Sequence, residues 1–192
     1  MSPTKELAIL PFASAALWER WLFGHHAQPD GVWLKVAKKA SGIASVTHEE
    51  ALDVALSYGW IDGQRKALDS SFFLQKFTPR RPNSLWSKRN IDKIATLTAA
   101  GRMQPSGLAE VEAAKQDGRW EAAYDSPKNM AVPEDFLKAL GENKQAQALF
   151  ETLNRSNVYA IAWRLKTAKN LEIRKRRFDA ILAMLERQDA FH

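Results

Sequence analysis

Apolar residues recur at helical spacing near the N-terminus, and this pattern predicts a first helix over Phe12–Phe23. Gly24 follows at a position where helices commonly end. The apolar stripe of this helix consists of Leu17, Trp18, Trp21 and Leu22. A second helix is predicted to begin after Thr47, because Thr47 and Glu50 have the spacing of a capping box.

Between and after these helices the pattern is that of β-strands. Gly31–Val36 is short and rich in β-branched and aromatic residues, which is typical of a strand. Trp60–Leu68 and Phe72–Thr78 flank the turn residues Asp69–Ser71, an arrangement that predicts an antiparallel hairpin. The hairpin is expected to pair with Gly31–Val36 in a small antiparallel sheet of about three strands, which Pro79 ends.

The rest of the chain is predicted to be helical. Asn83 or Ser84 would cap a helix that reaches Gly101, and Pro105 would begin another that ends at Gly118. Further helices are expected over about 133–140, 143–153, 157–168 and 171–188.

These elements predict an α+β fold in which a small sheet packs with helices and an all-helical C-terminal half follows. We expect an α+β domain with a short sheet and a basic hairpin over residues 1–126, and a helical sub-domain over residues 127–192. Ser126–Pro133 is the candidate linker.

Positive charge is concentrated in two segments of the 192-residue chain, whose formal net charge is +6. Trp60–Arg102 holds nine Lys or Arg against three Asp, and Arg164–Arg177 holds seven against one Glu. Such segments attract anionic partners, with phosphate groups and nucleic acid as the usual candidates, although a solvated basic face without a partner has the same composition.

Several classes of function are disfavoured by what the chain lacks. It has no cysteine, which excludes disulfides and thiolate chemistry and is typical of a cytoplasmic protein. It has no apolar run of about 18 residues, so we expect no membrane insertion. Phosphate-loop, dinucleotide-binding, serine-hydrolase and zinc-protease motifs are also missing, and we expect neither a metal site nor a cofactor.

The candidate site lies between Tyr58 and Asn90. Asp62 stands between two glycines and is the candidate acid or base, while an arginine-rich loop leads towards a predicted helix N-terminus, an arrangement suited to an anion. The candidate ligand-binding residues are Arg65, Lys66, Lys76, Arg80, Arg81, Ser84, Trp86, Ser87 and Asn90. Alternatively, Asp62 forms a structural ion pair with Arg80 or Arg81.

The aromatic residues of this region have two interpretations. Trp60, Phe77 and Trp86 could stack on bases of a nucleic acid, or they could belong to the hydrophobic core, which is the commoner role of aromatic residues at these spacings.

A set of short motifs is spread along the chain: Gly31-Val-Trp-Leu34, Lys38-Lys39, Glu50-Ala51, Gly59-Trp-Ile-Asp-Gly63, Thr78-Pro-Arg-Arg81, Ser84, Trp86-Ser87, Asn90, Lys93, Gly101-Arg-Met103, Gly107, Ala168-Lys169, Glu172, Arg174, Arg177 and Ile181-Leu182. These motifs resemble the pattern of the bacterial bacteriocin-protection family, also described as YdeI or OmpD-associated. The resemblance extends from about Phe12 to the final predicted helix, with departures at Ile173 and at Ser57-Tyr58. It implies a stress-resistance or bacteriocin-protection role of undefined biochemistry, and no established catalytic residues.

Three functions are consistent with the sequence. The first is a module that binds a phosphate-bearing or nucleic-acid ligand through the basic loop. The second is an enzyme acting on a small anionic substrate, with Asp62 as acid or base and the arginines as a clamp. The third is a protein-interaction module, or a homodimer, formed through the helical C-terminal half.

Overall fold

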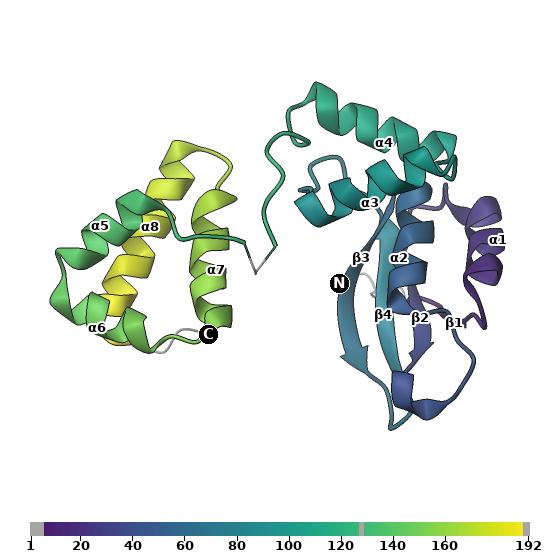
Figure 1. The fold of residues 1–192 in the computed structure, drawn as a ribbon, viewed down its shortest axis with the longest axis horizontal. Coiled ribbons are helices and arrows are strands. Elements are labelled where there is room, and N and C mark those ends of the chain that lie inside the picture. The colour runs from purple at the N-terminus through teal and green to yellow at the C-terminus, as the bar shows by residue number, and fades with distance from the viewer. Residues whose placement is uncertain (1–5, 127–128, 190–192) are drawn as a thin grey trace. The chain divides into compact units, whose positions relative to one another are not determined.

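The computed structural model describes residues 6–126 and 129–189, and the chain divides into two compact units (Figure 1). The N-terminal unit consists of residues up to Trp86 together with Asn90–Ala122. The C-terminal unit consists of Ser87–Arg89 and the chain from Ala123 onward. Residues 127 and 128, which fall within the predicted linker, lie outside the described residues.

A four-stranded sheet forms the centre of the N-terminal unit. Its strands are β1 (Ile9–Pro11), β2 (Val32–Ala37), β3 (Trp60–Ala67) and β4 (Phe72–Pro79), in the order β1-β2-β4-β3. The predicted hairpin is confirmed as β3 and β4, and β4 pairs antiparallel with β2. The predicted α+β class is therefore confirmed.

The expectation of about three strands missed β1. This strand has only three residues and pairs parallel to β2, with Ile9 opposite Trp33. Three residues ending in a proline are too few to display the alternation that marks a strand, and tertiary pairing decides their conformation.

Two helices, α1 (Ala15–His25) and α2 (His48–Ser57), cover one face of this sheet (Figure 1). Trp18 of α1 lies 5.7 Å from the Phe77 ring and 6.3 Å from the Trp60 ring, centroid to centroid, and all three side chains are fully buried. Trp60 and Phe77 are therefore core residues. Large aromatic side chains account for much of the apolar area buried here.

The helix ends follow the predicted chemistry only in part. The capping box of α2 is confirmed, since the Thr47 side chain accepts from the Glu50 amide and the Glu50 carboxylate accepts from the Thr47 amide. Gly24 does not end α1, which continues through His25 and is closed by the His26 amide donating to the Leu22 carbonyl. Without a left-handed turn at this end, glycine is not required.

A short 3₁₀ helix (Lys39–Ser41) follows β2, and α3 (Lys88–Ala99) and α4 (Pro105–Gln116) follow the hairpin. Pro105 occupies the first turn of α4 as predicted. The prediction that Asn83 or Ser84 caps α3 is wrong, because α3 begins at Lys88, whose amide donates to the Tyr124 carbonyl.

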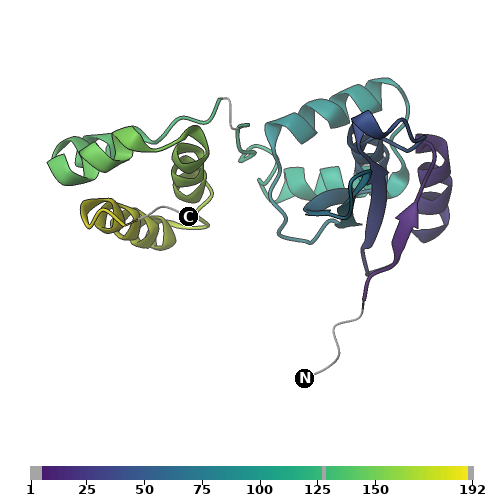
Figure 2. The same cartoon turned by 90° about the horizontal axis from the view of Figure 1, so that it is seen from below.

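The C-terminal unit contains α5 (Glu134–Gly141), α6 (Lys144–Thr152), α7 (Arg155–Lys166) and α8 (Leu171–Glu186) (Figures 1 and 2). Asn143, Asn154 and Asn170 cap the last three through side-chain oxygens. Its core is formed by Phe136, Leu140, Ala146, Ile161, Leu165, Ile181 and Leu185. Among the described residues, no helix is both long and apolar enough to span a bilayer.

Candidate functional site

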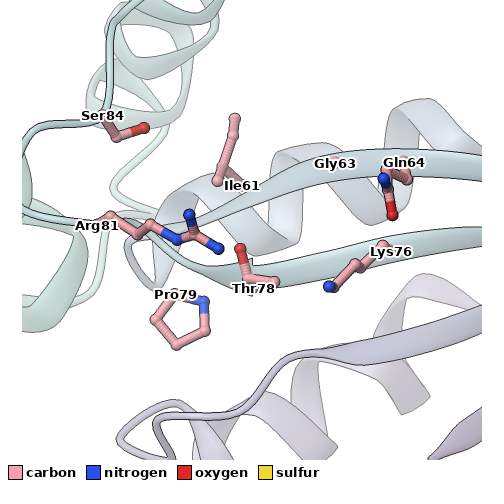
Figure 3. Close-up of a pocket in the computed structure, with 8 residues that line it drawn as sticks. All are labelled: Ile61, Gly63, Gln64, Lys76, Thr78, Pro79, Arg81 and Ser84. Atoms are coloured by element: carbon pink, nitrogen blue, oxygen red, sulfur yellow. The ribbon is translucent and has the colours of Figure 1, made fainter. Parts of the chain in front are cut away.

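A cleft with a volume of about 340 Å³ opens where β3 and β4 meet the loop that follows β4 (Figure 3). The pairing of Ile61 with Thr78 brings the two strands together at this point, and Pro79 ends β4. The cleft is lined by Ile61, Gly63, Gln64, Lys76, Thr78, Pro79, Arg81 and Ser84. All of these residues belong to the N-terminal unit.

One wall of the cleft is shaped by a β-bulge in β3, where the register shifts between Asp62 and Arg65. The buried side chain of Gln75 holds this bulge, because its Nε2 donates to the carbonyls of Gly63 at 2.9 Å and Gln64 at 3.3 Å. Arg65 Nε in turn donates to Gln75 Oε1 at 2.9 Å. The buried amide satisfies backbone groups that the irregular ladder leaves free.

The lining of the cleft is cationic and rich in hydroxyl groups. In Figure 3 the Thr78 hydroxyl lies between the Arg81 guanidinium and the Lys76 amine, and Ser84 adds a second hydroxyl. Among the described residues, none of those that line it is Asp or Glu. Two cations in a lining without a described carboxylate favour a positive potential inside the cleft.

Arg80 is buried beneath the loop rather than exposed in the cleft. Its side chain is 6% exposed, and its guanidinium carbon lies 3.5 Å from the centroid of the Trp86 ring, which is itself buried and packs on Trp120. Arg80 Nη1 donates to Ser84 Oγ at 3.4 Å and to the Leu85 carbonyl at 3.3 Å. Arg80 and Trp86 therefore position the loop that carries Arg81 and Ser84.

The other predicted ligand-binding residues lie elsewhere. The Arg65 guanidinium lies over the Phe73 ring at 4.4 Å, and the Lys66 amine lies over the Trp33 ring at 4.7 Å. Ser87 belongs to the C-terminal unit, where it bridges to Tyr124, and Asn90 lies in the first turn of α3. Of the predicted ligand-binding set, the structure brings Lys76, Arg81 and Ser84 together in the cleft.

Asp62 points away from this cleft. Its register with Phe77 places it on the face covered by α2, where its Oδ2 accepts a hydrogen bond from His48 Nε2 at 3.0 Å. The expected alternatives, a pair with Arg80 or with Arg81, are replaced by this contact. No local pattern links two residues 14 positions apart, so the partner of Asp62 follows only from the packing of α2 on the sheet.

A network of charges continues from His48 along the same side of the unit. Lys93 Nζ contacts Asp53 Oδ1 at 2.6 Å and Glu49 Oε2 at 3.1 Å, and so ties α3 to α2. Burial alone would lower the pKa of Lys93, but its hydrogen bonds with Asp53 and Glu49 outweigh this effect and raise the pKa. In the described part of the chain, no group of three or more His, Cys, Asp or Glu could hold a metal ion.

Sequence reasoning missed Ile61, Gln64 and Thr78 as lining residues. The signal for Thr78 was available, because Lys76 and Thr78 are two residues apart on a strand and must share a face. Gln64 gave no such signal, since the bulge changes which side of β3 each residue faces.

Fold and site together define a protein with a small α+β unit that carries a basic cleft, and a separate helical unit. Residues 10–110 match the family described as a domain of unknown function, DUF8412, and residues 129–188 match the family described as bacteriocin-protection, YdeI or OmpD-associated. Because the first match spans more than half of the chain, the chain belongs to the DUF8412 family, and its residues 129–188 are similar to the bacteriocin-protection, YdeI or OmpD-associated family.

The predicted resemblance to the bacteriocin-protection family is thus confirmed through the C-terminal match. The residues of that resemblance from Phe12 to Gly107 fall within the DUF8412 match. No curated protein and no solved structure matches the chain.

Proposed function

We propose that the N-terminal unit binds a phosphate-bearing anion in the cleft between β3, β4 and the loop after β4. The observation that carries this proposal is that Lys76, Arg81, Thr78 and Ser84 line one cleft, and that the described residues of its lining include no carboxylate. A guanidinium offers a planar fork that matches two phosphate oxygens, an ammonium adds a point charge, and hydroxyl groups donate to the remaining oxygens.

The size of the cleft supports a small ligand or one terminal group of a larger one. Its volume of about 340 Å³ is near the lower end of the range for small-molecule sites, which is roughly 300–1,000 Å³. The buried Arg80 supports binding in a second way, because its hydrogen bond to Ser84 Oγ helps to set the loop before a ligand arrives. A prearranged loop loses less conformational entropy on binding.

The geometry favours binding rather than chemistry that involves Asp62. Asp62 projects to the face of the sheet opposite to Ile61 and Thr78, and its Oδ2 is held by His48. A carboxylate on the far side of the strand lies outside hydrogen-bond reach of a ligand seated beside Thr78.

The proposal is tested by titration calorimetry of the full chain with inorganic phosphate, pyrophosphate and a nucleoside monophosphate at low salt. Arg81→Ala should weaken the binding of the best of these ligands by about ten-fold or more, since a charge-assisted hydrogen bond contributes about 1.5–3 kcal/mol. Arg102→Ala is the matched control, because Arg102 is exposed and outside the cleft. Equal affinities for the two variants, or no binding at millimolar concentrations of any of the three ligands, would refute the proposal.

A further inference from the structure

The face of the sheet opposite α1 and α2 carries three lysines, one from each of three neighbouring strands. In the antiparallel ladder Leu74 of β4 lies opposite both Lys35 of β2 and Lys66 of β3, so these three side chains form one row across the sheet. Lys76 lies two residues from Leu74 on β4 and therefore on the same face, opposite Trp33. We call this surface, defined by Lys35, Lys66 and Lys76, the lysine face.

Aromatic rings hold two of these lysines against the sheet. The Lys35 amine lies 4.1 Å from the centroid of the Phe72 ring, and the Lys66 amine lies 4.7 Å from that of Trp33. An ammonium group over an aromatic face is attracted by the electrons of the ring, which limits the directions in which the flexible side chain can point. Leu74 lies between Lys35 and Lys66 in the ladder and is nevertheless buried, which is expected where the apolar stems of long charged side chains lie over a neighbouring residue.

The lysine face carries charges of one sign, all positive, and it is continuous with the cleft. Along β2, β3 and β4, the residues whose register places them on this face include no Asp or Glu, while Asp69 in the hairpin turn interacts electrostatically with Lys35. Lys76 belongs to both surfaces, because it also lines the cleft with Arg81. Positive charge thus extends from Arg81 past Lys76 to Lys66 and Lys35.

We infer that the lysine face binds the backbone of a single-stranded nucleic acid, one phosphate of which occupies the cleft. This inference rests on the proposed function of the cleft and extends it. One small anion cannot contact lysines on three strands together with Arg81, whereas a chain of phosphates can. A broad sheet face with spaced positive charges can follow the backbone of a single strand, while a duplex is generally contacted by an element that enters a groove.

The test measures fluorescence anisotropy of a labelled 20-nucleotide single strand of mixed sequence, as RNA and as DNA, with the full chain at several salt concentrations. The double variant Lys35→Gln/Lys66→Gln removes two charges from the lysine face and none from the cleft. It should bind at least about ten-fold more weakly, and the slope of log affinity against log salt should decrease by about 1.4, corresponding to two lost phosphate contacts.

Two further variants separate charge from folding. Lys138→Gln/Lys144→Gln removes the same charge from exposed positions of the C-terminal unit and should bind like the unmodified chain. Lys35→Arg/Lys66→Arg keeps both the charge and the aromatic contacts and should also retain binding. If the glutamine variant is misfolded by circular dichroism, Lys35→Gln alone, which leaves the contact of Lys66 with Trp33 intact, replaces it and should lower the slope by about 0.7.

The outcomes also distinguish this inference from the proposed function. Pyrophosphate binding should be unchanged in Lys35→Gln/Lys66→Gln, because neither residue lines the cleft. The inference is overturned, and the cleft proposal survives, if pyrophosphate binds but the oligonucleotide does not. The same holds if Lys35→Gln/Lys66→Gln and Lys138→Gln/Lys144→Gln bind the oligonucleotide equally. Tighter binding to a duplex of the same sequence, or lysine-dependent binding to vesicles containing anionic lipid without oligonucleotide binding, overturns it as well. Failure of both ligands refutes both proposals.

Discussion

Replacing Arg80 with alanine should destabilise the N-terminal unit, whereas replacing its neighbour Arg81 should not. Arg80 is 6% exposed and stacks on the Trp86 ring at 3.5 Å, while Arg81 is exposed. The two residues are adjacent and chemically identical, so any difference between them reports the tertiary environment alone.

The magnitude follows from the contacts that Arg80→Ala removes. A cation over an indole at a desolvated position contributes about 2 kcal/mol. The two hydrogen bonds to Ser84 Oγ and the Leu85 carbonyl, at 3.4 and 3.3 Å, are long and add about 0.5 kcal/mol each. The expected loss is therefore about 3 kcal/mol, which for a unit of this size lowers Tm on the order of 10 °C. Arg81→Ala should stay within about 0.5 kcal/mol of the unmodified chain.

Urea unfolding followed by tryptophan fluorescence measures this difference, because six of the seven tryptophans lie in the N-terminal unit. Arg80→Lys is the matched control: it keeps the charge but loses the planar stacking, so its stability should fall between those of the alanine variant and the unmodified chain. The reasoning is refuted if Arg80→Ala and Arg81→Ala unfold at the same urea concentration, or if Arg81→Ala is the less stable of the two.

Three other outcomes are expected from stability measurements. Gly107→Ala should lower the free energy of unfolding in urea by about 1–3 kcal/mol, because the added Cβ would overlap the Ser57 carbonyl. Gly24→Ala should instead raise it by about 0.5–1 kcal/mol, because Gly24 lies in a helix and an added Cβ would meet no atom within 4 Å. Changes of the same sign in both variants would contradict this reasoning. Hydrogen bonds from the Thr47 amide and hydroxyl lower the pKa of Glu50, so the contribution of Glu50 to stability is complete above the unfolded pKa of 4.5 and is lost as pH falls through the lower folded pKa. The stability difference between the unmodified chain and Glu50→Gln should therefore shrink from pH 7 to pH 3. A constant difference would show that the Glu50 carboxylate does not stabilise the helix through its charge. Phe136→Ala should lower the free energy of unfolding of the C-terminal unit by about 3–5 kcal/mol. In urea, the circular dichroism of the helices should then begin to fall before the tryptophan fluorescence changes. A single unchanged transition would show that this residue is not central to a separate core.

Local chemistry explains why much of the architecture could be read from the sequence. The capping box at Thr47 and Glu50 and the proline at the start of α4 act within one helical turn, so their effects need no distant partner. The hairpin of β3 and β4 was predictable for the same reason, because its strands are joined by a short turn. Such elements are determined by neighbours along the chain.

The residues of the candidate site could also be predicted from the sequence, but their arrangement in space could not. The sequence places Lys76, Arg80, Arg81 and Ser84 in one basic segment. It cannot determine that Arg80 is buried on Trp86 while Arg81 is exposed, because that depends on the packing of a loop that has no periodic pattern.

By itself, then, the sequence determined the helices, the hairpin, the fold class and the excess of positive charge between Trp60 and Arg102. Only the tertiary structure decided that Asp62 pairs with His48 away from the cleft and that β1 joins the sheet. It also decided that some basic side chains are buried beneath the loop, while others line the cleft or lie on the lysine face. The physical reason is the range of the interactions: caps and turns act over a few residues, whereas strand pairing, burial and charge pairing join residues that are far apart in the chain.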